Sequence, residues 1–289
     1  MDFKENSNLQ DYLRKKEIQK ETVKANRKRI IEQQNKDSWK RYQTYLQDRL
    51  SGNTLFIGSN GPNVPVLDDL LLYYDAGVLS SYSGSGTLFG DLSGNSRSGT
   101  IVGSPTWNPN GWFDFSNDYI ITPDLDQAIT AAAEDHLVAV WVYPTNNGVI
   151  VNYNSDTDPT TGYRFSAIEL VSGQVEFGLW NGIGIASTNG TGALTFNTWH
   201  QIAMTYDKTT CRGYIDGELV GSVNVNFYSP MDSPEAFHML FGVNCVTNQG
   251  NGTYFDGRMA IMKVYGRALT SAEVIQNYTS HHRRFVYNG

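Results

Sequence analysis

The sequence predicts a mainly β fold, an antiparallel β-sandwich or barrel with an N-terminal α-helical arm and a short C-terminal helix. From Leu67 onward, apolar and polar residues alternate with period two in short segments, and Gly, Asn and Asp separate these segments. The composition agrees, because 28 Gly, 17 Tyr and 13 Phe favour strands and tight turns. Residues 3–50 lack Gly and Pro, and their Lys, Glu, Gln, Arg and Leu content is typical of helix.

Residues 1–50 also differ from the remainder in charge. They carry 13 Lys/Arg and 8 Asp/Glu, a balance of 13 − 8 = +5, whereas the remainder carries 22 − 13 = 9 basic and 29 − 8 = 21 acidic residues, a balance of 9 − 21 = −12. A basic arm can dock on an acidic protein surface or on nucleic acid, and it can also be a solvated charged helix. We favour protein docking and self-association, with a trimer as one option, because acidic residues are interspersed with the basic ones. The candidate assembly residues are Ile31, Trp39, Tyr42 and Leu46.

Residues 51–66 are rich in Gly, Asn and Pro and are interpreted as a linker, which leaves 67–289 as the folded domain. The alternating segments in this domain predict strands at 70–75, 136–144, 148–153, 163–170, 175–180, 199–206, 211–215, 219–223 and 255–265. A short helix is expected near 126–134. A second helix is expected to start at the capping box Thr270-Ser-Ala-Glu273 and to run to about Thr279.

Four segments of the domain carry a family likeness. They are the apolar strand into Asp-Ala-Gly and Asp-Leu-Ser-Gly-Asn (70–107), the Phe-Asp-Phe-Ser-Asn-Asp-Tyr strand (113–123), the Trp-His strand with its Asp-Gly turn (199–220), and the closing strand with its Arg-Ala-Leu corner and capped helix (255–278). Together they resemble the concanavalin A-like lectin/glucanase superfamily, in its laminin-G-like and pentraxin-like branch. The resemblance implies a jelly-roll-like sandwich of two curved antiparallel sheets, of the kind also found in phage and other virion proteins.

The carboxylates do not form the catalytic pattern of the superfamily's glucanases, which place several acids on one strand. Glu169 and Glu176 each stand alone in the sequence, and Asp216 and Glu218 flank Gly217 at a hairpin break, where Asp-Gly suits a tight turn. The five histidines lack metal-ligand spacing apart from the adjacent pair at 281 and 282, and no phosphate-binding loop occurs. We therefore expect a protein that is not an enzyme.

Two types of binding site are expected instead. Glycan binding would use exposed aromatic rings, for which Trp107, Trp112, Trp180 and Tyr228 are candidates, whereas Trp141 and Trp199 alternate with apolar neighbours and are expected in the core. The resemblance implies a Ca²⁺ site at a sheet rim, where Asp91, Asn95 and Asp118 match family positions rich in oxygen ligands. A hydrogen-bonded turn is the alternative explanation for these three residues.

These observations lead to a functional hypothesis. No apolar run approaches the ~20 residues that span a bilayer, and no basic and apolar leader opens the chain. Cys211 and Cys245 do not make a disulfide framework, so we expect free thiols. We expect a virion structural protein made in the host cytoplasm, a capsid decoration or head-fibre protein held to other virion proteins by its arm. A carbohydrate-binding adhesin and a tail or baseplate component are the alternatives, and a cell-surface glycan is an expected partner.

Overall fold

The computed structural model describes residues 65–125, 134–154, 164–180, 185–190, 192–225, 238–244 and 253–286. The chain divides into two units, residues 1–64 and residues 65–289. The arm, most of the linker and the helix expected near 126–134 lie outside the described residues. The domain begins slightly earlier than expected, because Val66 is already buried in it.

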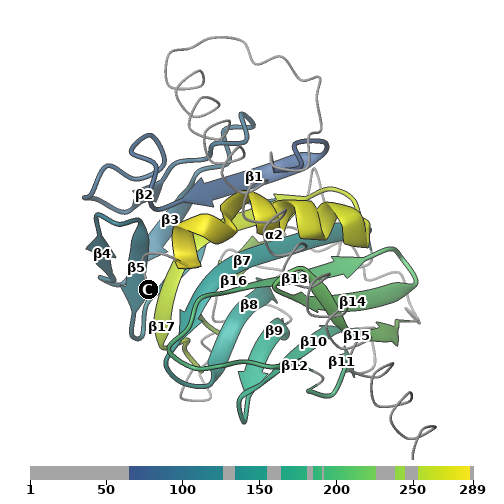
Figure 1. Ribbon diagram of the computed structural model, residues 1–289. Helices are drawn as coiled ribbons and strands as arrows, with labels where there is room; N and C mark the ends of the chain where they lie inside the picture. The colour runs from purple at the N-terminus through teal and green to yellow at the C-terminus, as the bar shows by residue number, and fades with distance from the viewer. Residues whose placement is uncertain are drawn as a thin grey trace, which may run out of the picture. The chain divides into compact units, whose positions relative to one another are not determined.

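The described residues form two antiparallel sheets and one helix (Figure 1). Sheet A has the order β15-β14-β13-β7-β17-β5-β4, with β1 also paired to β17, and sheet B has the order β11-β10-β9-β8-β16-β6-β3-β2, with β12 also paired to β10. The sheet A strands are β1 (Leu70–Asp75), β4 (Thr106–Asn108), β5 (Trp112–Phe115), β7 (His136–Pro144), β13 (His200–Tyr206), β14 (Thr210–Ile215), β15 (Glu218–Asn224) and β17 (Gly257–Tyr265). The sheet B strands are β2 (Leu88–Phe89), β3 (Gly99–Val102), β6 (Tyr119–Ile121), β8 (Gly148–Asn154), β9 (Arg164–Val171), β10 (Gln174–Trp180), β11 (Ile185–Ser187), β12 (Gly192–Ala193) and β16 (His238–Phe241). The predicted mainly β sandwich is confirmed.

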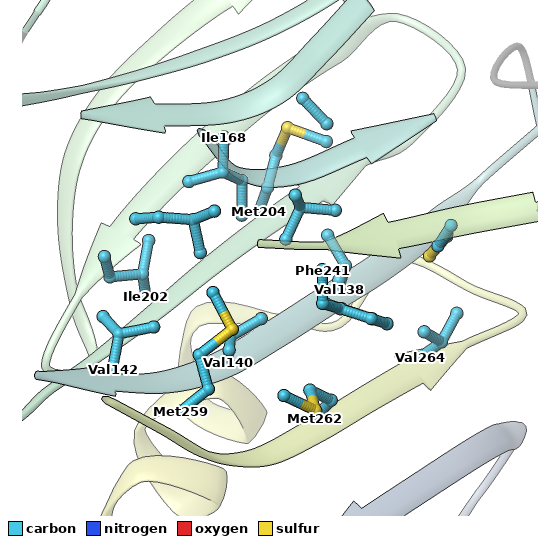
Figure 2. Packing of buried hydrophobic residues seen from close by; sticks show 14 of the residues in the cluster. Val138, Val140, Val142, Ile168, Ile202, Met204, Phe241, Met259, Met262 and Val264 are labelled. Carbon is cyan, nitrogen blue, oxygen red and sulfur yellow. The ribbon is translucent and has the colours of Figure 1, made fainter. Parts of the chain in front are cut away.

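The main core lies between the two sheets, where alternate residues of each strand face inward. In Figure 2, Val138, Val140 and Val142 of β7 lie among side chains from β13 and β17 of the same sheet and from β9 and β16 of sheet B. The two sheets approach closely at Gly213 of β14, where a Cβ atom would overlap the ring of Phe177 of β10. Position 213 must therefore be glycine because of the Phe177 ring on the opposite sheet, and not because of its own backbone conformation.

The stretch 113–123, expected as one strand, is divided between the two sheets. β5 ends at Phe115 in sheet A and β6 begins at Tyr119 in sheet B. Between them, Asn117 adopts a left-handed backbone conformation with φ 62°. The buried Asp118 carboxylate holds the crossing by accepting hydrogen bonds from the backbone amides of Ser116 at 3.0 Å and Ser104 at 2.6 Å.

The helix α2 (Ser271–Val286) lies across the outer face of sheet A and forms a second apolar layer with it (Figure 1). The predicted capping box is confirmed, since the Thr270 amide donates to Glu273 at 2.8 Å and the Glu273 amide donates to the Thr270 hydroxyl at 3.4 Å. The helix runs past the expected end at 279. Its last turns continue the buried stripe, because His281 and Phe285 also face sheet A.

Candidate functional site on the outer face of sheet B

The outer face of sheet B is the face that α2 leaves uncovered. α2 packs on sheet A, and within the described parts of residues 65–286 no helix packs on sheet B. Polar residues occur on this face of the strands β10, β9, β8 and β16, which are consecutive neighbours in the sheet. At the usual strand spacing, these four strands span roughly 14 Å.

Two glutamates lie directly opposite each other on this face. The antiparallel register of β9 and β10 pairs Glu169 with Glu176. Their strand neighbours Ile168, Leu170 and Phe177 point into the core, so both carboxylates point away from it. Such cross-strand pairs have Cβ atoms about 4.5–5.5 Å apart, and like charges in this position destabilise a sheet. The sequence suggested two isolated acids, and the register makes them a pair.

Asn152 adds unused hydrogen-bonding groups to the same face. It lies on β8 between the core residues Val151 and Tyr153, so its side chain projects outward, opposite Leu240 of β16. Asn152 is 0% exposed, and neither its amide oxygen nor its amide nitrogen has a hydrogen-bond partner. Leaving a buried polar atom unpaired costs about 1–3 kcal/mol.

His238 presents a third unused polar atom. It lies on β16, opposite Asn154, and its neighbour Met239 points into the core. Its Nδ1 lies 2.8 Å from the Thr122 carbonyl oxygen, which can only accept, so Nδ1 carries the hydrogen. In the neutral ring, Nε2 is therefore an acceptor, and it is buried without a partner. The same face of sheet B thus carries the carboxylates on β9 and β10, and an amide and an imidazole acceptor further along on β8 and β16.

The two aromatic candidates whose side chains the structure describes, Trp107 and Trp112, lie on sheet A. Trp107 is half-buried against the core and donates its Nε1 hydrogen to the Ala76 carbonyl at 2.9 Å. Trp112 was expected to be exposed, and this was wrong, because it is only 6% exposed on sheet A with its ring 5.9 Å from that of Trp199. Trp180 ends β10 on sheet B, where its backbone pairs with Ile185, and its side chain lies outside the described part of the structure. Tyr228 also lies outside it.

The calcium candidates occupy hydrogen-bonded loops. The Asp91 carboxylate accepts hydrogen bonds from three backbone amides and from the Ser93 hydroxyl, at 2.7–3.0 Å. The Asn95 amide donates to two backbone carbonyls, those of residues 70 and 71, at 2.8 and 3.1 Å. Asp118 lies in the separate crossing between β5 and β6. No group of three or more His, Cys, Asp or Glu suited to a metal occurs among the described residues, and calcium binding stays a prediction.

Asp216 and Gly217 form the expected turn between β14 and β15. Both have positive φ, 52° and 81°, which a two-residue hairpin of this kind requires. The Asp216 carboxylate accepts from the Gln201 amide at 2.9 Å and contacts His200 Nδ1 at 2.8 Å, so it joins the turn to β13. The sequence did not reveal this contact. It gives His200 and Asp216 a structural role on sheet A.

Two further expectations concern the arm and the membrane. The candidate assembly residues Ile31, Trp39, Tyr42 and Leu46 lie outside the described residues. Among the residues that the structure does describe, no helix has both the length and the apolar character to cross a bilayer.

The sequence of the domain also matches a family of known proteins. The model of the family described as "Concanavalin A-like lectin/glucanases superfamily" matches residues 114–275, which is more than half of the chain. The chain belongs to the concanavalin A-like lectin/glucanase superfamily. The search of curated protein sequences found no match to this chain.

Solved structures share its fold at low sequence identity. A Trypanosoma rangeli sialidase in complex with sialic acid has a TM-score of 0.56 and 15% identity over 76% of this chain and 34% of the sialidase. Domain 4 of AbnA, an extracellular arabinanase from Geobacillus stearothermophilus, in complex with arabinotriose, has a TM-score of 0.53 and 17% identity over 73% of this chain and 98% of that domain. A structure of botulinum neurotoxin type C, a toxin whose cell entry depends on interaction with two ganglioside molecules, has a TM-score of 0.52 and 13% identity over 74% of this chain and 52% of the toxin chain. The chain thus spans about a third of the sialidase and about half of the toxin chain.

Proposed function

We propose that the domain binds a carbohydrate on the outer face of sheet B. The observation that carries this proposal is the set of unsatisfied polar atoms of Asn152 and His238, which lie on the same face of sheet B as the Glu169–Glu176 pair. Sugar hydroxyls both donate and accept hydrogen bonds, so they complement a face that carries carboxylate, amide and imidazole groups. A sugar that reaches these buried polar atoms would pair them, and its other hydroxyls would donate to the carboxylates.

The fold relatives support this reading by analogy. One is a domain of an arabinanase in complex with arabinotriose, and another belongs to a toxin whose cell entry depends on gangliosides. A shared fold does not set the ligand, so the sugar recognised by this chain follows from its own residues.

Glycoside hydrolysis is a second candidate function, and the glutamate pair favours it. A retaining hydrolase requires two carboxyl groups about 5–5.5 Å apart, and directly opposed cross-strand residues can meet this condition. We rank binding first, because binding uses every polar group on the face, whereas hydrolysis uses only the two glutamates. Release of reducing sugar from a bound oligosaccharide would reverse this order.

The binding proposal predicts that the polar residues on sheet B are needed and that an acid on sheet A is not. The Glu169→Gln/Glu176→Gln variant should lose binding by about tenfold or more, since a hydrogen bond to a charged group contributes roughly 1.5–3 kcal/mol. The Asn152→Leu variant should lose binding by up to about tenfold, since a neutral hydrogen bond contributes about 0.5–1.5 kcal/mol. Binding is measured with the full chain on a glycan array, followed by calorimetry on the sugars that score, with and without Ca²⁺.

Glu218→Gln is the matched control for this experiment. Glu218 is an exposed acid on β15 at the edge of sheet A, so this variant should bind as the unmodified chain does. Equal loss in the control, or retention of binding in both sheet B variants, would contradict the placement of the site. Circular dichroism and the melting temperature show whether each variant is folded.

The wider role that we propose is a virion structural protein, a capsid decoration or head-fibre protein whose arm attaches the domain to a particle. The opposite charges of the two parts, +5 for residues 1–50 and −12 for the remainder, support separate tasks of attachment and display. Deleting residues 1–50 should lower the number of chains in the assembly, measured by analytical ultracentrifugation, while leaving sugar binding intact. An unchanged number of chains would contradict assembly through the arm.

A further inference from the structure

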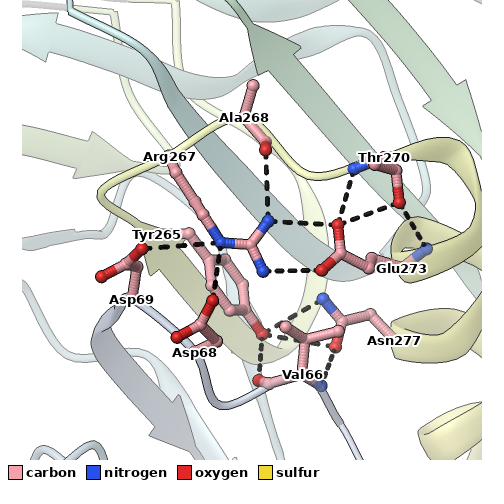
Figure 3. Close-up of polar contacts among 9 residues, drawn as sticks. All are labelled: Val66, Asp68, Asp69, Tyr265, Arg267, Ala268, Thr270, Glu273 and Asn277. Carbon is pink, nitrogen blue, oxygen red and sulfur yellow. Dashed lines mark hydrogen bonds and ion pairs between the residues drawn. The ribbon is translucent and has the colours of Figure 1, made fainter. Parts of the chain in front are cut away.

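The segment that connects residues 1–64 to the domain is held by α2. Val66 is buried, its amide donates to the Asn277 side-chain oxygen at 2.9 Å, and its carbonyl accepts from the Tyr265 hydroxyl at 2.8 Å (Figure 3). The Asn277 amide nitrogen also donates to the Tyr265 hydroxyl at 3.1 Å. This contact, the Val66 clamp, joins the segment before β1 to β17 and to α2.

Ion pairs also hold residues 68 and 69, which follow the Val66 clamp in the chain. Arg267 follows β17, and its guanidinium lies 3.2 Å from the Asp68 carboxylate and 3.6 Å from that of Asp69 (Figure 3). It also pairs with Glu273 in the first turn of α2 at 2.6 Å. Any loosening of α2 would therefore act directly on residues 66–69.

One turn beyond the clamp, α2 covers a buried titratable cluster. His281 is 1% exposed, with Nε2 3.3 Å from the Tyr73 hydroxyl and Nδ1 2.6 Å from the Ser280 hydroxyl. Lys263 of β17 is 2% exposed, lies with Nζ 4.7 Å from the centre of the Tyr73 ring, and has no hydrogen-bond partner for Nζ. Two bases are thus enclosed between the helix and sheet A.

Cations outnumber carboxylates in this cluster. β1 contributes Tyr73 and Asp75, β17 contributes Lys263, and α2 contributes His281 and Arg284. Arg284 Nη1 lies 2.5 Å from the fully buried Asp75 carboxylate, and Arg284 also donates to a backbone carbonyl of the turn before β5. When His281 is neutral, one carboxylate already faces two cations, so a proton on His281 would add a third positive charge in a dry interface.

We propose that the docking of α2 on sheet A is a pH-sensitive latch, which is closed in alkaline solution and loosens as the pH falls. The latch controls the Val66 clamp, and through it the hold of the domain on the segment that leads to residues 1–64. The controlling groups are His281 and Lys263, because each proton that they take up adds positive charge to an interface that holds one carboxylate.

The direction of the pH dependence follows from the shifts of both bases. Burial, with the charges of Lys263 and Arg284, holds the pKa of His281 well below 6.5, despite an opposing hydrogen bond to the backbone of Asn277. Below pH 6.5 the unfolded chain binds the extra proton, so stability falls as the pH falls. Burial also lowers the pKa of Lys263 from 10.5 to about 7, against the attraction of Asp75, so stability falls as the pH falls from 10.5 to about 7. Both groups favour the closed latch at higher pH.

The test is hydrogen exchange of the full chain at pH 8, 6.5 and 5, with rates corrected for intrinsic exchange and read by peptide. The α2 peptides and the peptide containing Val66 should open together, about tenfold more often for each pH unit below 6.5 per titrating group. In His281→Gln this acid dependence should fall to what His282 alone contributes, and in Lys263→Met the dependence between pH 8 and 6.5 should be smaller.

His136→Gln is the matched control. His136 is a fully buried histidine on β7 whose pKa burial lowers to about 4, and it contacts the Tyr153 hydroxyl of sheet B rather than α2. This variant should keep the acid-dependent opening of α2. His282 of α2, whose pKa burial also lowers, remains in every variant. Unchanged α2 exchange between pH 8 and pH 5 in the unmodified chain overturns the proposal whether or not the variants fold, and an undiminished acid response in a folded His281→Gln variant overturns the role of His281.

Discussion

Trp141→Ala should lower the free energy of unfolding by about 3–5 kcal/mol, the usual loss when a large buried aromatic side chain is removed. Trp141 is 1% exposed on the outer face of sheet A. Its ring stacks on Phe285 at 4.3 Å and on Tyr278 at 5.6 Å, both from α2. The truncation would therefore leave a cavity under the helix, and urea unfolding of the full chain followed by fluorescence and circular dichroism measures the loss.

Trp141→Phe separates the loss of the ring from the loss of its polar atom. The indole Nε1 is buried without a hydrogen-bond partner, so phenylalanine keeps an aromatic ring in the stack and removes an unsatisfied donor. A conservative change of this kind should cost less than about 1.5 kcal/mol. If the alanine and phenylalanine variants unfold at the same urea concentration, the helix is not held by this stack.

Asp75→Ala should be the second variant with a large effect, again about 3–5 kcal/mol. Asp75 is fully buried, and it accepts from Arg284 at 2.5 Å, from the Gly77 amide at 2.8 Å and from the Tyr73 hydroxyl at 3.3 Å. Removing one partner of a buried ion pair is strongly destabilising, because the remaining charge is left in a poorly solvated site. Here the uncompensated charge would be that of Arg284, with Lys263 close by.

Asp114→Ala provides the comparison for this second variant. Asp114 pairs with Arg258 at 2.9 Å, but the two side chains are 45% and 34% exposed, and pairs exposed to solvent contribute about 0–1 kcal/mol. The two variants delete the same side chain from two Asp–Arg pairs that differ in burial. Equal losses in chemical denaturation would show that burial of the Asp75 pair is not what makes it important.

Prediction from the sequence succeeded for elements that a local pattern within one strand or one turn specifies. The alternation in 136–144 and 199–206 predicted β7 and β13, and it correctly placed Trp141 in the core. The pair Thr270 and Glu273 predicted the start of α2, since a capping box is a local device with a fixed spacing. The Asp-Gly pair predicted the hairpin turn for the same reason.

The sequence was least informative where partners come from distant segments. β16 was missed, because His238 to Phe241 are all buried and show no alternation. The end of α2 was placed too early, because His281 and Arg284 look like a solvated helix end until Tyr73 and Asp75 are seen beneath them. The Glu169–Glu176 pair depends on the register between β9 and β10, and no local pattern reports that register.

The close approach of Gly213 to Phe177 also constrains how this domain can change over generations. The two positions, one on each sheet, share a single volume, so a side chain can appear at 213 only in a background where position 177 has already become smaller. The order of the two substitutions therefore matters. If residue 177 becomes smaller first, the intermediate has only a cavity opposite glycine. If residue 213 becomes larger first, the intermediate has a steric clash with the Phe177 ring. Related domains should accordingly carry either glycine with a large ring or a larger residue with a small one.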